Sequence, residues 1–92
     1  MVLEIEKKFA SRRKAFLAQR YPRVYAEMER TGELSGHLDK TGQHAKELMQ
    51  QIYNHNRPEI EAIQDKEKRE ARETQIWLMA EEAALQEIVL TL

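Results

Sequence analysis

The sequence predicts an all-α protein, a small helical bundle of four or five helices with a long C-terminal helical segment. Apolar residues recur at helical spacing, and the two prolines stand where one periodic segment gives way to the next. Charged residues make up 34% of a chain without cysteine, which is typical of helix-rich soluble proteins and excludes disulfide scaffolds and thiol catalysis. A chain of 92 residues suits a single core, so we expect one helical domain over residues 1–92.

The first helix is predicted to run from the N-terminus to about Arg20. Its apolar stripe steps at helical spacing and consists of Val2, Ile5, Phe9, Phe16 and Leu17. Tyr21-Pro22 ends it, because the residue before a proline avoids the helical region and a proline suits the first position of a new helix. A short second helix covers about residues 22–30 and ends at Gly32, which adopts the left-handed conformation without steric cost.

The third helix has the clearest periodicity. Its apolar seam alternates steps of four and three and consists of Leu34, Leu38, Thr41, Ala45, Leu48 and Ile52. A seam of this kind needs a helical partner along its whole length. Gly36 and Gly42 each weaken its early turns by about 1 kcal/mol relative to alanine. The pattern therefore allows a break near Gly42, with Thr41 as an internal N-cap.

The last helical segment is predicted to begin at Pro58, after a turn at residues 54–57. No glycine or further proline follows, so a continuous helix to Leu92 would be about 50 Å long. Residues 64–75 contain only Ala71 as an apolar residue. This middle stretch is therefore either a solvated rod or the bend between two helices.

The C-terminal end of this segment is too apolar to show one face to a core and the other to water. Two buried faces indicate either a central helix in the bundle or a seam between two copies, and we favour a homodimer. The residues expected on this partner or dimer surface are Trp77, Leu78, Leu85, Ile88 and Leu92.

Charge is distributed unequally along the chain. Residues 1–23 hold seven basic and two acidic residues, whereas residues 58–92 hold four basic and nine acidic residues. The asymmetry indicates either a basic patch for nucleic acid or two chain ends that attract one another within the fold. A helix-turn-helix arrangement fits the expected turn lengths poorly. The candidate nucleic-acid contacts are Lys8, Arg12, Arg13, Arg20 and Arg23.

Residues that could carry chemistry do not form a constellation in the sequence. His37 and His44 lie two turns apart without a third ligand at metal-binding spacing. Adjacent acids such as Glu81 and Glu82 point to different faces of a helix. We therefore expect no enzymatic activity, no cofactor and no metal site.

The location of the protein is predicted from its apolar runs. The first eight residues mix acids with apolar residues and do not form a signal peptide, and no run approaches about 18 uncharged apolar residues. We expect a cytoplasmic protein without a membrane-spanning segment.

Two stretches of the chain carry a recognisable pattern. The first is Arg12-Arg13-x-x-Phe16-Leu17-x-x-x-x-Pro22-x-x-Tyr25, followed by Gly32-x-Leu34-x-x-His37-Leu38, and the second is Trp77 with Ala84-x-x-Glu87-Ile88-Val89-Leu90. Together they resemble the TnpV family of transposon-encoded proteins, small accessory proteins of bacterial mobile elements. The resemblance implies a genetic setting and carries over no activity and no site residue.

These observations predict a non-enzymatic accessory or regulatory protein of a bacterial mobile genetic element, which binds a macromolecule through protein–protein contacts. One alternative is a DNA-binding accessory protein that uses the basic N-terminal helix. The other is an inhibitor of a host defence nuclease, similar to anti-CRISPR proteins, in which an acidic face imitates phosphates. That face consists of Glu67, Glu70 and Glu73.

Overall fold

The computed structural model describes residues 2–92 as four α-helices and one π-helical turn. The helices are α1 (Val2–Arg20), α2 (Pro22–Thr31), α3 (Leu34–Ala62) and α4 (Lys66–Ala84), and the π-turn η1 spans Leu85–Val89. No strand occurs in this described part of the chain. The predicted all-α bundle with a long C-terminal helical segment is confirmed.

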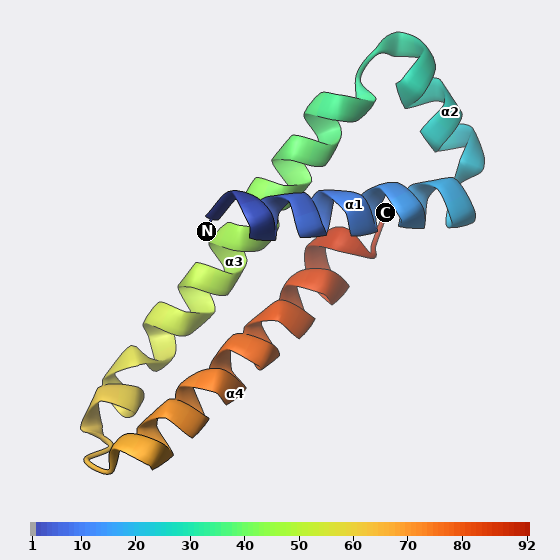
Figure 1. Ribbon diagram of the computed structural model, residues 1–92. Coiled ribbons are helices and arrows are strands. Elements are labelled where there is room, and N and C mark those ends of the chain that lie inside the picture. Colours follow the sequence, from blue (N-terminus) through green and yellow to red (C-terminus); the bar gives the residue numbers. More distant parts are fainter. Residues whose placement is uncertain (1) are drawn as a thin grey trace.

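The molecule is elongated, with principal extents of 54 × 20 × 17 Å. Helix α3 forms the long axis, α1 crosses it near its middle, and α2 joins the two at one end (Figure 1). Helix α4 returns along the second half of α3, and the chain ends beside α1 (Figure 1).

The boundaries of α1 and α2 follow the sequence signals. Pro22 occupies the first turn of α2 directly after α1 ends. Gly32 closes α2 in the left-handed conformation with φ of 81°, and its N–H donates to the Glu29 carbonyl at 3.3 Å. The N–H of Glu33 donates to the Met28 carbonyl at 2.9 Å, so both donors satisfy carbonyls that the helix end leaves free.

Helix α3 is continuous, so the break that the sequence allowed at Gly42 does not occur and the predicted turn before Pro58 was wrong. The chain does not break at Gly42, and the Thr41 hydroxyl donates to the His37 carbonyl within the helix at 2.9 Å instead of capping a new one. The predicted turn at residues 54–57 is helical, and Pro58 lies inside α3. A proline inside a helix removes one backbone hydrogen bond at a cost of about 3 kcal/mol. On either side of Pro58, α3 is joined to α4 by the stacked rings of Tyr53 and Trp77 and by the Glu59–Arg72 ion pair.

The reversal between α3 and α4 takes only three residues, 63–65, so the segment from Pro58 to Leu92 is bent rather than continuous. The Asp65 carboxylate caps α4 by accepting from the N–H groups of Glu67 at 2.9 Å and Lys68 at 3.3 Å. The Arg69 guanidinium donates to the Ile63 carbonyl at 3.2 Å, which ties the start of α4 to the end of α3. The polar stretch of residues 64–75 thus forms the turn and the first half of α4.

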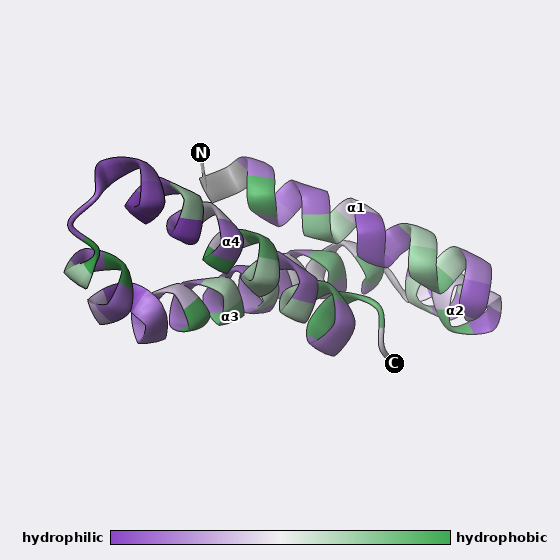
Figure 2. Cartoon of the chain, turned by 90° about the horizontal axis from the view of Figure 1, so that it is seen from below, coloured by the Kyte–Doolittle hydropathy of each residue, from purple (hydrophilic) through white to green (hydrophobic). Residues whose placement is uncertain are grey.

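The core lies where α1, α3 and the end of α4 meet. Its buried cluster consists of Phe9, Ala45, Met49, Ala80, Ala84 and Val89. Hydrophobic residues gather along these facing sides, whereas the start of α4 is mostly hydrophilic (Figure 2). The predicted seam of α3 faces its neighbours, since all of its members are buried or half-buried. Met49 was missed because it lies one position beside that seam.

At Gly42 the backbones of α1 and α3 come close together. A Cβ atom at this position would lie 2.6 Å from the Glu6 carbonyl oxygen, closer than non-bonded contacts allow. The glycine that weakens α3 as an isolated helix therefore permits α1 to cross it.

Candidate functional site

The structure places the five basic residues predicted to contact nucleic acid in three different environments. Arg13 is only 5% exposed, so it is unavailable as a surface contact, contrary to the prediction. Lys8 forms an ion pair with Glu81 of α4 and keeps a half-exposed side chain. Arg12, Arg20 and Arg23 are exposed. The Lys8–Glu81 ion pair joins the basic N-terminal segment to the acidic C-terminal one, so part of the unequal charge is neutralised within the fold.

Arg13 holds the C-terminal segment against α1. Its Nη1 donates to the carbonyls of Val89, at 2.9 Å, and Thr91. These are carbonyls that the end of η1 leaves without helical partners, so the guanidinium satisfies them. Burial lowers the pKa of Arg13, and the three acceptors around its guanidinium compensate part of its desolvation.

His37 provides the third acceptor of Arg13. The Arg13 Nε donates to the His37 Nε2 at 3.2 Å, which requires a lone pair on that nitrogen. Burial and the nearby Arg13 charge both lower the pKa of His37, so the imidazole is neutral at pH 7. His37 is therefore a structural hydrogen-bond acceptor that joins α3 to α1.

Three exposed arginines, Arg12, Arg20 and Arg23, lie along the second half of α1 and the start of α2, on a surface that we name the basic corner. Arg12 and Arg20 line one shallow depression together with Phe16, and Arg20 and Arg23 line the adjoining one together with Tyr21. No acidic residue of the described chain lines either depression. The basic corner also contains the start of α2, whose partial positive charge has the same sign.

Two aromatic residues of the basic corner pack against each other. The rings of Phe16 and Tyr21 meet edge to face with their centroids 5.6 Å apart. Tyr21 is 37% exposed, so part of its ring is open to solvent.

Three of the five residues predicted for a partner or dimer surface are engaged within the chain. Trp77 stacks on Tyr53 of α3, with ring centroids 4.4 Å apart and planes at 9°. Leu85 and Ile88 pack against the buried core cluster. Leu78 and Leu92 are the exposed members of the predicted set, at 62% and 65%.

A different apolar surface opens between α3 and α4, and we name it the α3–α4 groove. Its volume is about 500 Å³. Met79, which is 51% exposed, is the most accessible apolar residue in it. The residues that line the groove are Leu48, Gln51, Ile52, His55, Asn56, Met79 and Ala83. Met79 and Ala83 share one face of α4, and Leu48 and Ile52 share one face of α3. Only the packing of the two helices brings these two pairs together.

The acidic face proposed for α4 is not uniform. Glu67 and Glu70 are exposed, whereas Glu73 is half-buried and its carboxylate lies 3.5 Å from the Tyr53 hydroxyl. Arg72 lies beside them and pairs with Glu59 of α3 at 3.0 Å. Positive charges between the acids weaken any resemblance to a phosphate backbone.

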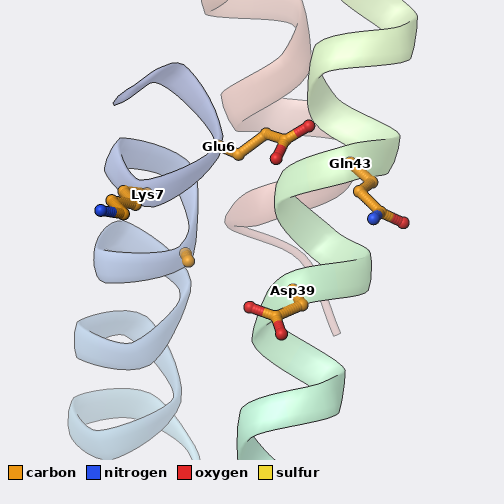
Figure 3. Close-up of a pocket in the computed structure, with 5 residues that line it drawn as sticks. Glu6, Lys7, Asp39 and Gln43 are labelled. Carbon is orange, nitrogen blue, oxygen red and sulfur yellow. The ribbon is translucent and has the colours of Figure 1, made fainter. Parts of the chain in front are cut away.

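A polar cleft of about 290 Å³ separates α1 from the first half of α3 (Figure 3). Glu6, Lys7, Asp39 and Gln43 line it, and the Glu6 side chain points across towards α3 (Figure 3). The Glu6 carboxylate pairs with Lys46 at 3.2 Å, so that interaction joins the two helices. Within the described residues, no three histidine or acidic side chains converge as metal ligands would.

The described helices include none that has both the length and the apolar character needed to span a membrane. No curated protein and no solved structure gives a significant match to this chain. The family model described as transposon-encoded protein TnpV matches residues 4–89, which include α2, α3, α4 and η1 and nearly all of α1. The chain therefore belongs to the TnpV family of transposon-encoded proteins.

Proposed function

We propose that this transposon-encoded protein is a non-enzymatic accessory protein that acts by binding a partner protein at the α3–α4 groove. The observation that carries the proposal is the open apolar centre of the groove, where Met79 is 51% exposed beside Leu48 and Ile52. Exposed apolar side chains that share one depression with a polar rim are typical of protein-binding surfaces.

The partner that fits this surface presents apolar side chains from an amphipathic helix. Such a helix lays its apolar face in a groove between two helices, with anchors at helical spacing. Gln51, His55 and Asn56 also line the groove and offer hydrogen-bonding groups to the polar side of the partner.

The test compares a tagged wild-type chain with two variants in pull-downs from the native host, after nuclease treatment. Met79→Glu places a charge in the centre of the groove. Leu78→Glu is the comparison variant, because Leu78 is also exposed but does not line the groove. Proteins that bind the wild type and Leu78→Glu but are lost with Met79→Glu support the proposal. Loss of the same proteins with Leu78→Glu alone would assign binding to the C-terminal surface predicted from the sequence instead of the groove. Equal recovery with all three chains argues against it.

A second copy of the chain is one candidate for the partner. Light scattering measures the mass of the purified protein, 10.9 kDa for a monomer, over a range of micromolar concentrations. A dimer that dissociates in Met79→Glu and persists in Leu78→Glu assigns the groove to homodimerisation. A strict monomer removes the homodimer and leaves a different protein as the partner.

A further inference from the structure

We propose that the basic corner binds the phosphate backbone of a nucleic acid. This surface lies on α1 and α2 and does not share a lining residue with the α3–α4 groove. The inference concerns a second ligand of different chemistry, and it stands independently of the protein partner proposed above.

The first argument is the state of the charges after folding. Lys8 and Lys46 pair with carboxylates, and Arg13 is buried on backbone carbonyls. Among the described residues, no carboxylate lies within 4.0 Å of the charged nitrogens of Arg12, Arg20 or Arg23. These three cations are thus available to an external anion.

The second argument is their placement. Arg12 and Arg20 lie two turns apart on α1, which corresponds to about 12 Å along the helix at 1.5 Å per residue. Arg23 continues the same surface in the first turn of α2. Duplex DNA carries one charge per about 1.7 Å of its axis, so phosphates are close enough together to meet all three arginines. A small anion would meet only one or two of them.

The third argument is the exposed ring of Tyr21 between Arg20 and Arg23. An aromatic side chain beside backbone-binding cations can stack on an unpaired base, which contributes about 1–3 kcal/mol in single-strand binding. The phosphate contacts are common to duplex and single-stranded ligands, whereas this stacking favours the single strand.

The experiment measures binding of the full chain to a labelled duplex DNA and to one of its strands by fluorescence anisotropy. We expect a dissociation constant on the order of 10⁻⁵ M at about 50 mM salt for at least one of the two ligands. Three phosphate contacts predict a slope of about −2.7 for the logarithm of the association constant against the logarithm of salt concentration for the duplex. Affinity for the duplex should therefore fall about 40-fold between about 50 mM and about 200 mM salt.

Matched variants separate local contacts from net charge. Arg12→Gln combined with Arg20→Gln removes two cations from the basic corner, and Lys66→Gln combined with Lys68→Gln removes two exposed cations from α4. We expect the first pair to weaken binding at least 10-fold and to reduce the salt slope to about −0.9, and the second pair to change affinity less than about threefold. Helical content measured by circular dichroism establishes that both variants are folded.

Each outcome decides the proposal. A loss of DNA affinity in the Arg12 and Arg20 variant that the Lys66 and Lys68 variant does not show supports it. If Tyr21→Ala then weakens binding of the single strand but not of the duplex, unpaired nucleic acid is the preferred ligand. No binding to either DNA at low salt overturns it, as does an equal loss in both charge variants. Met79→Glu should leave the affinity unchanged, so failure here is distinguishable from failure of the groove proposal.

Discussion

Gly42 offers the sharpest test of how α1 and α3 pack, because Gly36 provides a control in the same helix. Both glycines lie in the first half of α3. A Cβ at Gly36 meets no atom within 4 Å, whereas a Cβ at Gly42 would lie 2.6 Å from the Glu6 carbonyl oxygen and 3.2 Å from the Glu6 carbonyl carbon. Replacing each glycine with alanine therefore adds the same methyl group to an open and to a closed position.

The two substitutions should change the free energy of unfolding in opposite directions. Alanine is favoured over glycine in a helix by about 1 kcal/mol, and this gain applies at both positions. At Gly42 the added methyl group meets backbone atoms that cannot rotate aside, so α1 must move away from α3. Overpacking costs about 1–3 kcal/mol, and a backbone clash belongs at the upper end of that range. We expect Gly36→Ala to stabilise the protein by about 1 kcal/mol and Gly42→Ala to destabilise it by about 2 kcal/mol.

Urea and thermal unfolding followed by circular dichroism measure both effects. For a domain of this size, 1 kcal/mol shifts Tm by about 4–8 °C. Gly36→Ala should raise Tm by that amount, and Gly42→Ala should lower it by roughly twice as much. If both variants raised Tm alike, the close crossing of α1 over α3 would be refuted, because only helix propensity would then matter.

Two further predictions concern the buried contacts. Acidification should destabilise the fold through His37, because burial and the Arg13 charge lower its pKa in the folded state. Below about pH 6.5 the His37 side chain takes up a proton in the unfolded chain but resists it in the folded one. The free energy of unfolding is therefore at its full value above about pH 6.5, and the contribution of His37 is lost as the pH falls through its folded-state pKa. Urea unfolding at about pH 7.5 and about pH 5.5 checks this, and a His37→Gln variant with the wild-type pH dependence would contradict it. Ile76→Ala should cost about 2–5 kcal/mol because Ile76 is fully buried, whereas Leu78→Ala at the exposed position two residues later should stay within about 0.5 kcal/mol. Similar melting temperatures for these two variants would show that the assignment of the α4 core face is wrong.

The candidate surfaces were predictable in part. Arg12, Arg20 and Arg23 were identified from charge alone, but sequence could not separate them from Arg13, which lies next to Arg12 on a different face of the helix and is buried. A single residue turns a helical position by about 100°, so which arginine faces solvent depends on where the neighbouring elements pack. The α3–α4 groove was missed because Met79 and Ile52 belong to different helices, and only the packing of those helices brings them together.

Local signals predicted the helix ends where a single residue dominates the backbone. Pro22 begins α2 and Gly32 ends it as expected, since proline fixes φ and glycine tolerates a positive φ. Pro58 has the same intrinsic preference but lies inside α3, which contacts α4 through Tyr53 and Glu59 on either side of the proline. Local preference decided the outcome where no long-range contact opposed it.

The amino-acid sequence by itself determined the helical class, the two α2 boundaries, the apolar seam of α3 and the surplus of basic residues near the N-terminus, because each depends on periodicity or on the preference of one residue. Tertiary structure alone decided that Gly42 is a crossing point, that Arg13 binds the C-terminal carbonyls and that Trp77 stacks on Tyr53. These contacts join residues 20 or more positions apart. Their formation depends on how whole helices fit together, and no local pattern encodes that fit.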